Sequence, residues 1–173
     1  MPYPEPLVTP MREELTRLGV QELRTSDEVD RALDEAQVGT TLAIVNSVCG
    51  CAAANARPAV ALAQRVEPQP DRYVTVFAGQ DLEATARLRQ YLAGIPPSSP
   101  FMALLKDGDP VFVLERRHIE GRSASAIATD LANAYAKFCG ADAVELGGEP
   151  ERPEVEAGPD ARADLPPTFR SIL

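Results

Sequence analysis

The chain has 173 residues, with 17 Lys and Arg against 26 Asp and Glu, so its formal net charge is −9. This charge argues against a nucleic-acid partner, because such proteins need a basic surface. The apolar share of 45%, with no Trp, fits one domain with a mainly aliphatic core. No stretch approaches the roughly 20 apolar residues of a membrane span, and the first 18 residues lack the pattern of a secretory signal. We therefore expect a cytoplasmic protein without a membrane partner.

Apolar spacing and capping signals predict alternating helices and strands. The first helix is expected to begin at Pro10 with Thr9 as its cap, and the second opens with a capping box from Thr25 to Glu28. The elements expected after them are a strand at 41–46, a helix at 52–66 kinked by Pro58, a strand at 73–77, a helix at 82–92, strands at 101–106 and 111–115 joined by an Asp107-Gly108 turn, and a helix capped by Ser123.

This order predicts an α/β fold with a central mixed four-stranded sheet, flanked by helices, and two extra helices at the N-terminus. Such an arrangement is thioredoxin-like, and we expect it to occupy residues 1–139. Residues 140–173 hold eight Asp and Glu against three Arg, together with five Pro and four Gly. They show no helical or strand period, so this acidic segment is predicted to be a mobile or loosely docked tail.

The motif Cys49-Gly50-Cys51 lies where an expected buried strand gives way to a helix. Free N–H groups and the helix dipole favour an anion at that point, and the thiolate is the nucleophile of disulfide chemistry. Cys49 is therefore the predicted nucleophile, with a lowered pKa, and Cys51 is expected to point more inward. A disulfide between these two residues would close a small ring and be relatively oxidising.

Four further residues are predicted to contact the substrate. Ser99 and Pro100 precede the strand at 101–106, where thioredoxin-like folds place a cis-proline beside the reactive cysteines, so we expect a cis Ser99–Pro100 bond. Asn46 and Ser47 line the approach to Cys49 and are expected to hydrogen-bond a bound ligand.

Three other residues are open to a functional and a structural interpretation. His118 is a conceivable base for Cys49, but its neighbours read as a solvated link between a hairpin and a helix. Cys139, at the end of the last helix, is favoured as a half-buried structural thiol over a third redox partner. Arg57 is equally compatible with raising the local positive potential and with an ordinary surface position.

Closely paired cysteines in a reducing compartment are more often catalytic or metal-binding than structural. The leading interpretation is a thiol–disulfide oxidoreductase. One alternative is a protein that binds a soft metal through both cysteines, although two ligands are fewer than the four of a usual zinc site. Another is a thioredoxin-like interaction module without catalysis.

The chain resembles the bacilliredoxins, thioredoxin-like proteins with a Cys-Gly-Cys active site, over about residues 2–139. The resemblance is carried by several motifs, at Tyr3–Val8, Pro10–Leu15, Val45–Ala52, Ala56–Ala59, Thr75–Asp81, Pro97–Pro100, Leu104–Gly108 and Ile119–Ser123. The tail after Cys139 departs from the shorter family pattern.

This resemblance implies removal of bacillithiol, a low-molecular-weight thiol, from S-bacillithiolated proteins. Cys49 would attack the mixed disulfide and carry bacillithiol, while Cys51 matches the second cysteine and would close an internal disulfide as an alternative resolving step. Free bacillithiol and a flavin-dependent bacillithiol disulfide reductase would regenerate the protein. Disulfide isomerase activity is also implied. No permanently bound cofactor and no metal are expected.

Overall fold

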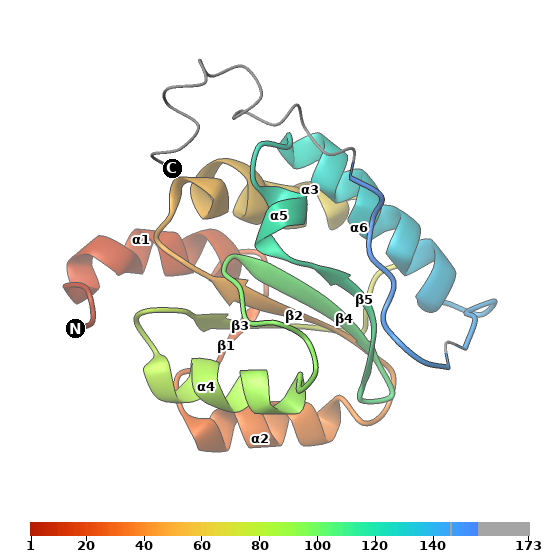
Figure 1. Ribbon diagram of the computed structural model, residues 1–173, viewed down its shortest axis with the longest axis horizontal. Coiled ribbons are helices and arrows are strands. Elements are labelled where there is room, and N and C mark those ends of the chain that lie inside the picture. The colour runs from red at the N-terminus through yellow and green to blue at the C-terminus, as the bar shows by residue number, and fades with distance from the viewer. Residues whose placement is uncertain (146, 156–173) are drawn as a thin grey trace, which may run out of the picture.

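A computed structural model describes residues 1–145 and 147–155 of the chain as a three-layer arrangement with a mixed sheet in the middle (Figure 1). The sheet has five strands in the order β1-β3-β2-β4-β5. β1, β3 and β2 run parallel to one another, whereas β4 is antiparallel to β2 and to β5. The strands are β1 (Gln21–Glu22), β2 (Thr40–Asn46), β3 (Arg72–Phe77), β4 (Phe101–Lys106) and β5 (Asp109–Leu114).

The prediction of an α/β fold with a mixed sheet is confirmed, but the predicted number of four strands is wrong. The additional strand, β1, consists of only two polar residues that pair with Val74 and Thr75 at the edge of β3. So short a polar segment has no apolar alternation, which is the signal that identifies a strand from sequence. Its pairing is set by the neighbouring strand, and the backbone N–H of Leu23 extends it by donating to the carbonyl of Thr75.

Helices cover both faces of the sheet. On one face pack α1 (Glu5–Thr16), α3 (Arg57–Ala63) and α6 (Ala124–Phe138), and on the other pack α2 (Ser26–Glu35) and α4 (Leu82–Tyr91), as Figure 1 shows. β2 serves both layers because successive side chains point to opposite faces. Leu42 and Ile44 join the core under α3 and α6, while Ala43 and Val45 join the core over α2 and α4.

Two helices begin elsewhere than the sequence suggests. α1 starts at Glu5 rather than Pro10, and Pro10 lies inside it, because the buried stripe extends back to Val8. The helix expected at 52–66 is divided into a π-helical turn η1 (Ala52–Ala56) and α3. Pro58 therefore lies in the first turn of α3, directly after an irregular turn, and the kink expected at this proline stays a prediction.

The local signals at the second helix and at the hairpin are confirmed. The hydroxyl of Thr25 accepts from the backbone N–H of Glu28, whose carboxylate accepts from the backbone N–H of Thr25. Asp107 and Gly108 both have positive φ, 49° and 87°, between β4 and β5. This is the backbone that a tight hairpin turn requires.

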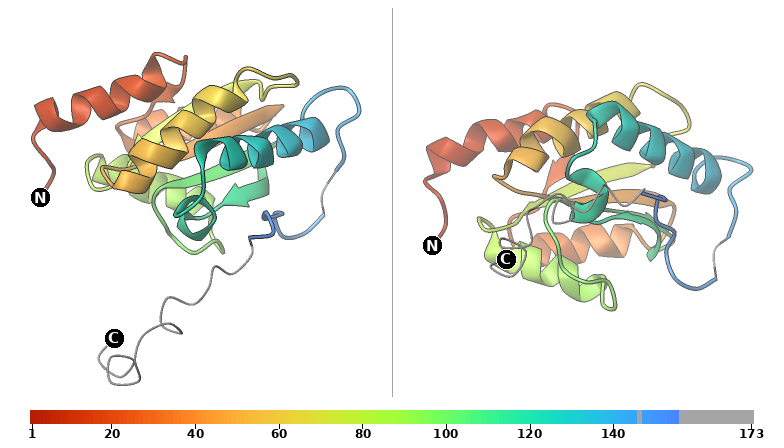
Figure 2. Two further views of the ribbon diagram at one scale, coloured as in Figure 1. Left: turned by 90° about the horizontal axis from the view of Figure 1, so that it is seen from above. Right: turned by 45° about the horizontal axis from the view of Figure 1, so that its top comes forward.

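The chain returns to the sheet after α6. The backbone N–H of Glu151 donates to the carbonyl of Val111, and its carbonyl accepts from the N–H of Val113, so the segment around Glu151 lies along β5 in both Figures 1 and 2. The division at residue 139 stays a prediction, and residues 146 and 156–173 of the expected tail lie outside the described part. Within residues 1–145 and 147–155, none of the helices has both the length and the apolar character needed to cross a membrane.

Candidate active site

The two thiols lie just beyond the carboxyl end of β2. β2 is buried throughout and ends at Asn46, and the carbonyl of Cys49 accepts from the backbone N–H groups of Ala52 and Ala53, which starts the helical turn. Both cysteines are free and half-buried, and their Sγ atoms are 3.1 Å apart. This distance is a hydrogen-bonding contact between two reduced sulfurs.

The surroundings shift the pKa values of the two thiols in opposite directions. Burial favours the protonated form of Cys49, but hydrogen bonds from Ser47, Cys51 and the backbone N–H of Ala52, together with the charge of Arg116, lower its pKa below the ordinary value. The Ser47 hydroxyl lies 3.1 Å from Cys49 Sγ. Burial and the neighbouring Cys49 sulfur raise the pKa of Cys51. The predicted lowering at Cys49 is thus confirmed, and Cys49 is the sulfur of the pair that ionises first.

The two cysteines are half-buried alike, so the expectation that Cys51 points more inward than Cys49 stays a prediction, but their surroundings differ. Cys51 packs against the core cluster under α3 and α6, whereas Cys49 lines an open cleft. We refer to this as the Cys49 cleft. It measures about 310 Å³ and is lined by Tyr3, Ser47, Val48, Cys49, Ala78, Gly79, Arg89, Ser99 and Arg116.

Of the predicted substrate-contacting residues, Ser47 and Ser99 reach this cleft. The Ser99–Pro100 peptide bond is cis, as expected, and Pro100 itself is buried at the start of β4. The carbonyl of Ser99 lies 3.5 Å from Nη1 of Arg116. The backbone preceding Pro100 therefore faces the same opening as Cys49.

Asn46 stabilises the backbone between β2 and the two thiols through its side-chain amide. Its Oδ1 accepts from the backbone N–H of Ser47 at 2.9 Å and from Arg57 Nη1 at 3.1 Å, and its Nδ2 donates to the carbonyl of Met11. Arg57 is 3% exposed, donates to the Ser47 carbonyl and pairs with Glu14 at 2.6 Å. Its position is therefore buried, and it holds the backbone that carries Ser47. A ligand contact from Asn46 stays a prediction.

The sequence interpretation of His118 is corrected by the structure. The residue belongs to a short helix, α5 (Arg116–Ile119), and is 3% exposed rather than solvated. Its Nδ1 accepts from the backbone N–H of Glu115, so the imidazole fixes the start of α5. Three clustered charges beside it suggested an exposed link, but the side chain turns inward against the core. Cys139 is also more buried than expected, at 3% exposure, and burial raises its pKa.

Sequence reasoning missed Arg116, Arg89 and Tyr3, which line the cleft from α5, α4 and the segment before α1. No local pattern singles out an arginine whose neighbours in space come from distant segments. Among the described residues, no three His, Cys, Asp or Glu side chains lie close enough together to hold a metal ion. The two thiols alone offer half of the ligands of a usual zinc site.

Comparisons with known proteins agree with this geometry. The model of a family described as Disulphide isomerase matches residues 3–139. A bacilliredoxin of Salinibacter ruber is 60% identical over 173 residues, and a second from that organism is 54% identical, each alignment covering 99% of both chains. A bacilliredoxin of Geobacillus kaustophilus is 52% identical over 139 residues, which is 80% of this chain and 95% of that relative.

The two Salinibacter relatives show that the residues after Cys139 are shared by some relatives, whereas the Geobacillus relative aligns only to the shorter part. Both kinds of relative span the segment with the two neighbouring thiols. The chain belongs to the bacilliredoxin family, and it is a thiol–disulfide oxidoreductase.

Proposed function

We propose that this protein removes bacillithiol from S-bacillithiolated proteins, with Cys49 as the attacking sulfur. The observation that carries the proposal is the asymmetry of the thiol pair. Cys49 has the lowered pKa and lines the cleft, while Cys51 has the raised pKa and packs against the core cluster, with its sulfur 3.1 Å from that of Cys49. A nucleophile needs its thiolate at neutral pH, and a resolving thiol needs only to be adjacent.

In the first step, the Cys49 thiolate attacks the bacillithiol sulfur of the mixed disulfide. A new S–S bond forms between Cys49 and bacillithiol, the old one breaks, and the client cysteine leaves as a thiolate that takes a proton from water. In the second step, free bacillithiol attacks this bond and releases Cys49 as a thiolate, with bacillithiol disulfide as the oxidised product. A flavin-dependent bacillithiol disulfide reductase would return that product to the thiol.

Cys51 offers an alternative second step. Its thiolate attacks Cys49 Sγ, forms the internal disulfide and expels bacillithiol. The same step favours a second activity, disulfide isomerisation, because a neighbouring thiol releases a substrate that stays trapped on Cys49. The match of residues 3–139 to the Disulphide isomerase family supports this activity as well.

The proposal includes a thioredoxin-like fold, which the arrangement of strands and the position of the cis-proline support. β2 and β3 form a parallel pair connected through η1 and α3, and the antiparallel strands β4 and β5 follow, with the cis Ser99–Pro100 bond directly before β4. Ser99 is half-buried and lines the Cys49 cleft, where its backbone is suited to pair with an extended client segment. A cytoplasmic location is part of the proposal, since both thiols must be reduced to act, and the domain is proposed to span residues 1–139.

A set of cysteine variants tests the proposal on a purified S-bacillithiolated protein, with release followed by mass spectrometry. We expect Cys49→Ser to reduce release to the uncatalysed rate. Cys51→Ser should accumulate one bacillithiol on Cys49, and Cys139→Ser, the matched control, should behave like the natural protein. Equal release by Cys49→Ser and the natural protein would refute the assignment. Stoichiometric metal in the purified protein would favour the metal-binding alternative instead.

A further inference from the structure

The Cys49 cleft has a charge opposite to that of the whole protein. The chain carries a net charge of −9, yet the charged side chains that line the cleft are Arg89 and Arg116, and no Asp or Glu of the described residues lines it. The two arginines come from different layers, Arg89 from α4 and Arg116 from the start of α5. Their convergence on the reactive sulfur is a property of the fold, since 26 residues separate them along the chain.

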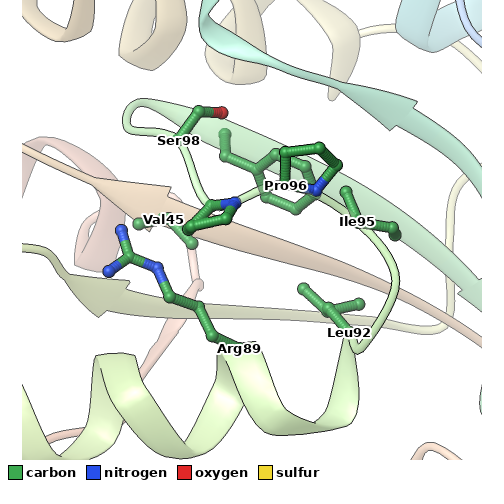
Figure 3. Close-up of a pocket in the computed structure, with 8 residues that line it drawn as sticks. Val45, Arg89, Leu92, Ile95, Pro96 and Ser98 are labelled. Carbon is green, nitrogen blue, oxygen red and sulfur yellow. The ribbon is translucent and has the colours of Figure 1, made fainter.

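Arg89 is exposed and lines the Cys49 cleft from α4. Figure 3 shows its side chain extending from α4 toward Val45 at the end of β2, beside an apolar pocket that it lines together with Leu92 and Ile95. Among the ion pairs of the described residues, α4 contributes Arg87, which pairs with Asp30 at 2.6 Å, and not Arg89. The guanidinium of Arg89 therefore has its donors free for a ligand within this part of the chain.

Arg116 lines the Cys49 cleft from the first residue of α5. Its backbone N–H donates to Ser98 Oγ at 3.2 Å, and its Nη1 lies 3.5 Å from the Ser99 carbonyl, so its backbone is fixed to the loop before Pro100. Its guanidinium pairs with Glu120 at 3.4 Å, with both side chains about half exposed. Exposed pairs of this kind contribute at most about 1 kcal/mol. An incoming anion competes readily with Glu120 for this group.

We propose that Arg89 and Arg116 form a binding subsite for the carboxylates of the small thiol that Cys49 carries, so that the protein prefers anionic thiols to neutral and cationic ones. The inference rests on the proposed function, because the thiol enters the cleft through its bond to Cys49. Guanidinium groups bind carboxylates in a bidentate manner, which fixes orientation as well as charge. A cleft of about 310 Å³ suits a small molecule of this class.

The subsite acts on the thiol and not on the client protein. Carboxylates of a client could give the same attraction, so the test uses small symmetric disulfides that contain no protein. Dithiodipropionate is anionic, bis(2-hydroxyethyl) disulfide is neutral and cystamine is cationic, and the three are similar in size. Cys51→Ser provides the background, since its Cys49 forms one stable mixed disulfide per molecule.

The experiment measures the rate of adduct formation at low ionic strength and divides it by the thiolate fraction of Cys49, taken from the pH profile of iodoacetamide labelling. We expect dithiodipropionate to react fastest and cystamine slowest. Arg89→Gln and Arg116→Gln should each lower the dithiodipropionate rate by roughly fivefold, as loss of a charge-assisted contact predicts. The rate with the neutral disulfide, divided by the thiolate fraction in the same way, should fall much less, because this disulfide presents no carboxylate to either arginine. Arg65→Gln, which removes an exposed charge two residues after the end of α3, is the matched control.

The outcomes separate the subsite from the proposed function. Equal rates for the three disulfides, or equal losses with all three in Arg89→Gln and Arg116→Gln, would overturn the subsite and leave the thiol chemistry intact. No reaction of Cys49 with even the neutral disulfide would contradict the proposed function itself. A dithiodipropionate rate that Arg65→Gln lowers as much as Arg116→Gln would also overturn the subsite, because net charge alone would then explain the preference.

Discussion

Two groups of charged residues lie near the carboxyl ends of β1, β2 and β3, and they are built in opposite ways. The first, which we call the Arg12 cluster, consists of Arg12 with Glu5, Glu22 and Asp81. Arg12 is 4% exposed, binds Asp81 through two nitrogens at 2.6 and 2.9 Å, and also pairs with Glu22 and Glu5. The second is the Cys49 cleft, whose two arginines are exposed and, within residues 1–145 and 147–155, pair with no buried carboxylate.

The two groups differ in how completely their arginines are paired within the protein. The Arg12 guanidinium also lies over the Phe77 ring, 5.2 Å from its centroid, so this buried group has both carboxylate partners and an aromatic contact within the protein. It joins α1 to the ends of β1 and β3 and to the start of α4. The charges of the Cys49 cleft have partners only in part, which is the condition for binding something else. Burial and completeness of pairing thus distinguish a charge that holds the fold from one that serves a ligand.

The largest expected difference is in the free energy of unfolding when one arginine of each group is replaced. Arg12→Ala leaves the buried side of Asp81 without its counter-charge, while Glu22 keeps its pair with Arg24 at 3.3 Å. Loss of one partner of a buried ion pair typically costs about 3–5 kcal/mol. Arg116→Ala removes an exposed group and should change the free energy of unfolding by no more than about 0.5 kcal/mol. Urea denaturation of both variants measures this difference. Similar stabilities for the two variants would show that the Arg12 cluster is not a structural one.

The same contrast explains which parts of the molecule could be predicted from sequence. The capping box at Thr25, the hairpin turn at Asp107-Gly108 and the strand that leads to Cys49 all depend on short-range signals, and all three were predicted. Arg116 was not, because its role arises from contacts with Ser98 and Ser99 across 17 or more residues. Likewise, nothing near His118 in sequence reveals that its side chain turns into the core.

A second variant sharpens the comparison inside the cleft. Ser47→Ala removes the hydroxyl that lies 3.1 Å from Cys49 Sγ, one of the groups that lower the pKa of this thiol. The pKa of Cys49 should rise, so the thiolate fraction and the alkylation rate at neutral pH should both fall. Iodoacetamide labelling against pH measures the shift, with Ser26→Ala on the opposite layer as the control. An unchanged profile would mean that the hydroxyl does not stabilise the thiolate.

The smallest expected effect is on the pH dependence of stability, through His118. This residue does not line the cleft but holds the start of α5, which carries Arg116. Burial, and then the positive charge of Arg117, lower the pKa of His118 below its ordinary value, while Glu115 acts in the other direction. The folded protein therefore holds the neutral imidazole, whose Nδ1 accepts from the backbone N–H of Glu115 at the start of α5. That contact fixes the helix whose first residue is Arg116.

The sign of the pH dependence follows from proton binding. Below the unfolded pKa of about 6.5, the unfolded chain takes up a proton at His118 and the folded chain does not, so stability falls as the pH drops through this window. Since the chain has one histidine, this window belongs to His118, whereas the carboxylates with lowered pKa, such as Glu28 and Glu115, act at lower pH. Urea unfolding at pH 7.5 and 5.5 should show the loss in the natural protein and a smaller one in His118→Asn. An equal slope in both proteins would mean that the imidazole becomes charged inside the fold, and α5 would then be held by other contacts than this one.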